Sequence, residues 1–148
     1  MARTLLVLIL GSVLVVGVHG QTASQPHVTK MGEGIDEDGI HFGLTTWEAP
    51  DGTTWTITHN EFPSPAAAQE YLDKQVAKAL KMVKRSNVKD SSEKIVGKRV
   101  EVIVNARVKE GNRETPAVLR TNGAQFYIIL SDSFRHISQF ENAPGSRK

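Results

Sequence analysis

Two segments in the first half of the chain alternate between apolar and polar residues, which is the pattern of half-buried strands. Residues 40–47 place three large apolar side chains on one face, and residues 53–59 set tryptophan and isoleucine against a row of threonines. The intervening Pro50-Asp51-Gly52 is typical of a turn, because proline presets φ and glycine permits a positive φ. The pattern therefore predicts a β-hairpin.

Residues 66–85 repeat apolar positions every three or four residues, which is the spacing of a helix. Ser64-Pro65 is a typical helix start, because serine caps the first turn and proline fits the first helical position. Ser86-Asn87 is the expected end. One arc of the predicted helix is apolar and consists of Ala68, Leu72, Val76, Ala79 and Val83. The opposite arc, called the basic ridge below, holds Lys74, Lys78, Lys81 and Arg85.

Three further strands are predicted in the second half of the chain, at residues 98–106, 116–121 and 126–130. The first of them places three valines on one face. Asn122-Gly123 separates the other two strands and is a strong signal for a tight hairpin. A two-residue turn at this point pairs Leu119 with Phe126 and Ala117 with Ile128.

The remaining sequence predicts a short C-terminal helix over residues 134–142, capped from Ser131-Asp132-Ser133, with a further strand as the alternative. Residues 143–148 are expected to fray. The order β-β-α-β-β-β, followed by this helix, predicts an α+β fold. We expect a mostly antiparallel sheet of about five strands with one long amphipathic helix packed on it. Residues 40–142 form the single predicted domain.

The N-terminus carries the pattern of a secretory signal peptide over residues 1–20. A charged start with Arg3 is followed by an apolar run of about 15 residues and a small-residue exit, so cleavage is expected after Gly20. An uncleaved anchor is the alternative, but the run is shorter than the roughly 20 residues that span a bilayer. We therefore expect a secreted or periplasmic protein with no membrane-spanning segment after cleavage, and a flexible acidic arm over residues 21–39.

Three short motifs lie in the stretch from residue 43 to residue 141. They are Phe62-Pro63-Ser64-Pro65 before the helix, Val96-Gly97-Lys98-Arg99-Val100 at a strand start, and the strand sequence of residues 126–130. With this layout the chain resembles an uncharacterised family of small exported bacterial proteins, and it is distantly similar in fold to PsbP-like domains. The resemblance covers about two thirds of the chain. Its motifs are structural, so it implies no functional residue.

Composition narrows the possible chemistry. The chain has 148 residues and no cysteine, which excludes thiol catalysis, cysteine-ligated zinc, iron–sulfur clusters and covalently attached haem. No phosphate-binding or dinucleotide-binding glycine pattern is present in the sequence. No cofactor is therefore expected.

Charge is segregated along the chain. Residues 21–73 hold one base and nine acids, a net charge of −8, whereas residues 74–120 hold thirteen bases and five acids, a net charge of +8. The two halves either neutralise each other on folding or leave a charged surface for a partner. The basic ridge, which Lys84, Lys89 and Lys94 adjoin, is the candidate binding surface.

Other candidate sites have weaker support. His41, His59 and Glu61 are suitable transition-metal ligands, but they assemble only if their strand faces coincide across the hairpin, so no metal site is predicted. Asp36-x-Asp38-Gly39 resembles a fragment of a calcium loop without its closing glutamate.

Catalytic groups are also sparse. Ser131, Asp132, Ser133 and His136 lie close in sequence, but no nucleophile elbow is present and a helix cap explains them. No catalytic residue is predicted.

The leading hypothesis is an exported, non-enzymatic binding domain. It would dock an acidic protein, an acidic polysaccharide or an anionic lipid surface through the basic ridge, which the acidic arm would cover in part. Nucleic acid is disfavoured because no stacking aromatic adjoins the ridge. The alternative is a small envelope hydrolase or isomerase with a pocket between helix and sheet, lined by Trp55 or Tyr127 beside a buried histidine or carboxylate. A protease inhibitor that uses the loop at residues 110–113 or 122–123 is a third possibility.

Overall fold

The computed structural model describes residues 25–108 and 111–143, which form seven strands and two helices. In chain order these are β1 (His27–Ile35), β2 (His41–Glu48), β3 (Thr54–Glu61), α1 (Pro65–Lys78), β4 (Lys81–Lys89), β5 (Ile95–Val108), β6 (Gly111–Asn122), β7 (Gln125–Leu130) and α2 (Phe134–Asn142). Within the described ranges, neither helix has the length and apolar character needed to cross a membrane.

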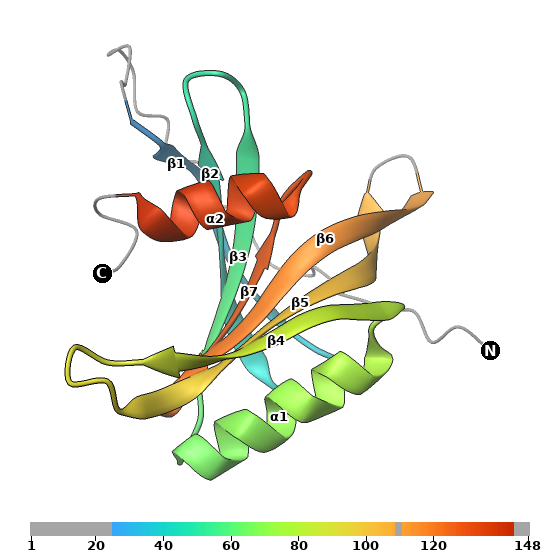
Figure 1. Cartoon of the computed structure of the whole chain (residues 1–148). Coiled ribbons are helices and arrows are strands. Elements are labelled where there is room, and N and C mark those ends of the chain that lie inside the picture. The colour runs from blue at the N-terminus through green and yellow to red at the C-terminus, as the bar shows by residue number, and fades with distance from the viewer. Residues whose placement is uncertain (1–24, 109–110, 144–148) are drawn as a thin grey trace.

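All seven strands join one antiparallel sheet in the order β1-β2-β3-β7-β6-β5-β4. The sheet consists of two meanders, β1–β3 and β4–β7, which α1 connects along the chain. The pairing of β3 with β7 joins the meanders side by side. Helix α1 covers one face of the sheet and α2 covers the other (Figure 1). The sheet therefore has two edges, β1 and β4.

Each helix encloses its own apolar core against the sheet. Under α1, Leu72 and Phe126 are fully buried among the valines of β5, namely Val100, Val102 and Val104. Under α2, Ile137 and Phe140 pack on Trp55, Val118 and Ile129. Successive residues of β6 and β7 point to opposite faces, so these central strands supply both cores and are buried on both sides.

Polar contacts also fix α2 to the sheet. Glu141, near the end of the helix, accepts hydrogen bonds from Arg99 of β5 at 2.7 and 3.1 Å and lies 3.6 Å from Arg120 of β6. Burial acts to lower the pKa of Arg99, but its hydrogen bonds to Glu141 and Glu101 outweigh this effect and raise that pKa. The arrangement aligns the C-terminal half of α2 with β5 and β6.

The predicted five-strand sheet with one long helix is wrong. Helix α1 starts where the sequence predicts, with the Ser64 hydroxyl accepting a hydrogen bond from the N–H of Ala67 at 3.1 Å, but it ends at Lys78. Ala79 is already extended, and the N–H of Leu80 donates to Ile103 of β5 at 2.9 Å. The residues predicted to form its last turns are the strand β4. Pairing with β5 therefore overrides a helical pattern that contains no stop signal.

The second missed strand is β1, which lies within the segment predicted to be a flexible arm. It pairs with β2 from His27 to Ile35 but has little apolar character. Gly34 allows close packing, because a Cβ atom at this position would lie 2.6 Å from the ring of Phe42. Because this strand is held mainly by backbone pairing, it leaves no alternating apolar pattern. The observed order is therefore β-β-β-α-β-β-β-β-α.

The hairpin between β6 and β7 is present, but its predicted register is wrong. Asn122 pairs with Gln125, so Gly123 and Ala124 form the turn, with a positive φ of 58° at Gly123. Leu119 consequently pairs with Ile128 rather than with Phe126. The register is shifted by two residues, which keeps each side chain on its predicted face. The apolar pattern alone does not distinguish the two registers.

Gly97 allows an unusually close approach between β5 and the end of β6. A Cβ atom at this position would lie 2.0 Å from the backbone oxygen of Thr121. Two hydrogen bonds exploit the approach: the N–H of Lys98 donates to the Thr121 hydroxyl at 3.0 Å, and the N–H of Gly123 donates to Val96 at 2.7 Å. Gly97 thus fixes the β6–β7 turn against the start of β5.

Candidate functional site: the acidic turn and the basic strand

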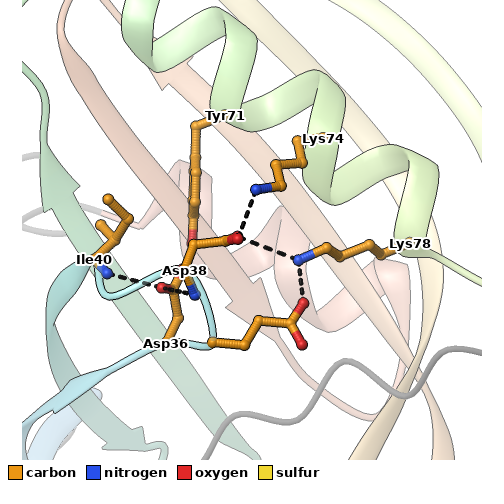
Figure 2. Close-up of polar contacts among 7 residues, drawn as sticks. Asp36, Asp38, Ile40, Tyr71, Lys74 and Lys78 are labelled. Atoms are coloured by element: carbon orange, nitrogen blue, oxygen red, sulfur yellow. Dashed lines mark hydrogen bonds and ion pairs between the residues drawn. The ribbon is translucent and has the colours of Figure 1, made fainter.

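The turn between β1 and β2, residues 36–39, is organised by Asp36 and is called the acidic turn below. One carboxylate oxygen of Asp36 accepts hydrogen bonds from the N–H groups of Asp38 at 2.9 Å and Ile40 at 2.8 Å. Gly39 closes the turn with a φ of 77°, which glycine adopts without strain. This geometry directs the carboxylate of Asp38 toward α1 (Figure 2), where the carboxylate of Glu37 also contacts Lys78.

The acidic turn binds two of the four predicted site residues. Lys74 donates to Asp38 at 2.6 Å, and Lys78 lies 3.3 Å from the other oxygen of the same carboxylate while also bonding Glu37 (Figure 2). The Lys78 side chain is 16% exposed and that of Lys74 is 51% exposed. The turn therefore covers the helical part of the basic ridge, and it covers Lys78 most completely.

Tyr71 connects the acidic turn to the core. Its hydroxyl donates to the second carboxylate oxygen of Asp36, and its ring lies against Phe126 and Phe62, each with centroids 4.9 Å away. Burial and the neighbouring Asp36 raise the pKa of the Tyr71 phenol, so the proton needed for this hydrogen bond is retained throughout the physiological range. The core beneath α1 thus positions the turn.

The contacts between the turn and α1 shift two pKa values in opposite directions. The hydrogen bond from Lys74 is the largest cause that lowers the pKa of Asp38, and Lys78 adds to it. Burial acts to lower the pKa of Lys78, but hydrogen bonds to Glu37 and Asp38 outweigh it and raise that pKa. Both shifts favour the charged pair.

Replacing Lys74 by glutamine is expected to move the pKa of Asp38 upward, toward the ordinary value of 3.8. The folded-state pKa lies below the unfolded one, so the contact stabilises the protein above about pH 4 and is lost as the pH falls through the folded-state value. A side-chain NMR titration of Asp38 in wild type and Lys74→Gln measures the shift. An unchanged titration would show that Lys74 does not hold this carboxylate, and Lys94→Gln is the matched control.

The other two predicted site residues, Lys81 and Arg85, lie on β4 rather than on α1. Arg85 faces the α1 side, where it lies 3.3 Å from Asp73, and it pairs in register with Val100. Lys81 pairs with Ile103 on the α2 side of the sheet. The structure therefore divides the predicted ridge between two elements, and only its first half forms a helix face.

Strand β4 collects the remaining positive charge. Its charged residues are all bases: Lys81, Lys84, Arg85 and Lys89. Lys81 and Lys84 are exposed, and neither has an ion pair within the described ranges. Lys89 contacts Glu93 at 2.8 Å, and both of these side chains are more than half exposed. Surface pairs of this kind contribute little, about 0–1 kcal/mol. We call these four residues the basic strand.

His41 of β2 and His59 of β3 lie on the same face of the sheet, so the condition set by the sequence, that their strand faces coincide across the hairpin, is met. Gly43 pairs with His59, and a hollow of 220 Å³ is lined by His41, His59, Glu33 and Glu61 around that glycine. The His59 ring stacks on Tyr127 and contacts Gln125. Among the residues the structure describes, no three histidine or acidic side chains are arranged to hold a metal ion. The hollow is also smaller than the roughly 300–1,000 Å³ typical of ligand pockets.

The serines near the C-terminus have structural partners. The Ser131 hydroxyl donates to the carbonyl of Thr54 at 2.8 Å, and the Ser133 hydroxyl accepts from the backbone N–H of His136 at 3.2 Å as the cap of α2. Asp132 lies 3.4 Å from Arg113. The Nδ1 atom of His136 is buried and has no hydrogen-bond partner in the described part of the chain. These contacts match a helix cap, not a nucleophile paired with a base.

Trp55 is a core residue. It is 4% exposed, its ring lies 5.2 Å from that of Phe140, and its indole nitrogen donates to the carbonyl of His136 at 2.8 Å. The buried polar residues of the described ranges are Thr58, Asn60, Gln75, Thr121 and Ser131, which include neither a histidine nor a carboxylate. Trp55 is therefore a core side chain under α2, and the hydrolase or isomerase alternative stays a prediction.

Comparisons with known proteins add no further assignment. No family model matches this chain, and neither the curated proteins nor the solved structures give a match. The resemblance to small exported bacterial proteins and to PsbP-like domains accordingly stays a prediction.

Sequence reasoning missed Tyr71 as the residue that positions the acidic turn. Its partner Asp36 lies on another element far along the chain, and no spacing rule connects the two. Sequence reasoning also missed the exposed apolar residues of β4, because the predicted helix assigned Val83 to its buried face. Val83 is 47% exposed.

Proposed function

We propose that this chain is an exported, non-catalytic binding module that docks an acidic partner through the basic strand. The observation that carries the proposal is the charge of β4, an edge strand with four bases and no acid. Two of those bases, Lys81 and Lys84, are exposed and lack an ion pair within the described ranges. Export rests on the signal-peptide pattern of residues 1–20, which lie outside the described residues.

The acidic turn supports the choice of partner. Its carboxylates lie against Lys74 and Lys78, so the basic half of the chain already binds acidic groups within the molecule. That contact leaves the helical bases largely occupied and the basic strand open. A partner that carries carboxylates or similar anions would therefore meet β4 first.

Ionic strength should control this binding. Each exposed ion pair contributes about 0.2–1 kcal/mol, so useful affinity needs several pairs formed together. At physiological salt the Debye length is about 8 Å, and interactions between exposed charges weaken accordingly. Binding that is unaffected by salt would contradict an electrostatic mechanism.

The test is binding of the purified chain to poly-L-glutamate, an acidic polysaccharide and anionic lipid vesicles at low and physiological salt. The double variant Lys81→Glu/Lys84→Glu is expected to lose at least tenfold in affinity at low salt. The matched control is Lys30→Glu/Arg135→Glu, which changes the net charge equally on β1 and α2 and should bind nearly as wild type. Thermal unfolding of each variant confirms that the fold is retained.

Two results would overturn the proposal. The first is no binding of wild type to any acidic probe at low salt. The second is an equal loss in both double variants, which would show that net charge alone drives association. The three probes also separate the possible sources of negative charge, since a protein, a polysaccharide and a membrane present it differently.

A further inference from the structure

Strand β4 is the outermost strand on its side of the sheet. It pairs with β5 along one side only, and no described strand pairs with the other. The free side of an edge strand presents a row of backbone N–H and C=O groups that another extended chain can complete. In Figure 1 this strand crosses the front of the molecule above α1, with β5 behind it. Within residues 25–108 and 111–143, the free side of β4 is therefore open to an added strand.

The edge also carries exposed apolar side chains. Leu80, Met82 and Val83 are 42%, 54% and 47% exposed, and Ile95 at the start of β5 is 52% exposed. Scattered single apolar residues on a surface are ordinary, but Leu80, Met82 and Val83 lie together at the start of β4, whereas Ile95 pairs with Lys89 at its other end. A strand added to the free side of β4 would cover part of the first group.

The register of β4 sorts its side chains between the two faces of the sheet. Lys81 and Lys84 pair with Ile103 and Glu101 and so lie on the α2 side. Met82 and Arg85 pair with Val102 and Val100 on the α1 side. An added strand would therefore meet two lysines on one face, and a methionine with an arginine on the other.

These positions favour a particular sequence pattern in the occupant. Acidic residues at every second position would lie beside Lys81 and Lys84, and the alternate residues would be apolar to cover Met82. Opposite charges that face each other on neighbouring strands stabilise the pairing. The exposed side chains of β4 thus fit an alternating acidic and apolar segment.

The same charges disfavour a second copy of this chain at the edge. Pairing β4 with β4 of another molecule would bring four bases against four. The other edge, β1, has one base and one acid, Lys30 and Glu33, and offers no matching acidic row.

We propose that an extended acidic segment of a partner protein adds to β4 as an eighth strand. This inference rests on the proposed function and specifies its mode: backbone hydrogen bonds supply the register, and the basic strand selects an acidic sequence. Of the three kinds of acidic partner considered above, the inference selects a protein segment and not a polysaccharide or a lipid surface.

The experiment compares two blocked octapeptides with the same four glutamates, one alternating Glu–Val and the other alternating N-methylglutamate and proline. N-methylation and proline together remove the backbone donors on both edges of the peptide, which prevents a ladder, while the charge spacing is kept. The Glu–Val peptide is expected to bind at least tenfold more tightly. It should also slow amide hydrogen exchange in β4 and leave exchange in β1 unchanged. An alternating Lys–Val peptide should not bind.

Each outcome supports or overturns the inference. Equal binding of the two glutamate peptides overturns strand addition and leaves the electrostatic proposal standing. Failure of both peptides, together with the acidic polymers, overturns both proposals. If the acidic polymers bind but neither glutamate peptide does, only the proposal of an added strand is overturned. Without peptide, a dimer in sedimentation equilibrium together with protection of the β4 amides from hydrogen exchange would assign the edge to a second copy instead.

Discussion

Replacing Gly97 by alanine is expected to lower the free energy of unfolding by about 3 kcal/mol or more. The new methyl group would lie 2.0 Å from the backbone oxygen of Thr121, a distance that no rotamer change can relieve. Either β5 or the end of β6 must move. The hydrogen bonds from Lys98 to the Thr121 hydroxyl and from Gly123 to Val96 would then lengthen. Thermal unfolding should show a midpoint lower by roughly 10 °C.

Gly32→Ala is the matched control for this substitution. Gly32 also lies in a strand, β1, but a Cβ atom there would meet nothing within 4 Å. This change should be neutral or stabilising by about 0.4–1 kcal/mol, because alanine reduces the freedom of the unfolded chain. Equal effects of the two substitutions would show that the close approach at Gly97 does not constrain the fold.

Replacing Phe126 by alanine is expected to cost about 3–5 kcal/mol, the usual range for a buried aromatic residue. Phe126 is fully buried, and both Tyr71 and Phe62 contact its ring edge-on, with centroids 4.9 and 6.4 Å away. The side chains under α1 cannot close the resulting cavity without moving the helix. Chemical denaturation with an unchanged m-value measures the loss.

The same variant connects the core to the acidic turn. Tyr71 loses one of its two aromatic neighbours in Phe126→Ala, so its hydroxyl should hold Asp36 less firmly. The pKa of Asp38 should then move upward toward 3.8, as in Lys74→Gln. Phe126→Leu, which removes less volume, should show a smaller loss of stability and a smaller shift. An Asp38 titration that matches wild type in a destabilised Phe126→Ala would show that the turn is held independently of the core.

The sequence predicts those parts of the fold that bury an apolar face in an ordinary way. The hairpin of β2 and β3, the start of α1 at Ser64, the valine row of β5 and the short α2 all follow from local spacing and capping. Strand β4 could not be predicted in this way, because its residues continue the helical spacing of α1 and pairing with β5 decides their conformation. Strand β1 could not be predicted for the opposite reason: it buries few side chains, so its sequence has no regular apolar spacing.

The candidate site, too, could be predicted only in part from the sequence. Charge counting located a basic region correctly in sequence, but it assigned Lys81 and Arg85 to a helix, whereas both lie on the edge of the sheet. The contact of Glu37 and Asp38 with α1 depends on the sheet order, which brings the β1–β2 turn beside a helix from later in the chain. No local property of either segment encodes this neighbour. The face on which each base lies, and its contacts with other elements, could therefore be found only from the structure.

The join between the two meanders has a consequence for how the chain acquires its fold. Strand β3 ends before α1, whereas its partner β7 belongs to the last part of the described chain, so the two halves of the sheet cannot unite until β7 is available. Such non-local pairing forms more slowly than the local hairpins within each meander. Until β7 has been made, β3 remains an unpaired edge, and the first meander can neither complete the sheet nor gain the core that β7 shares with β6.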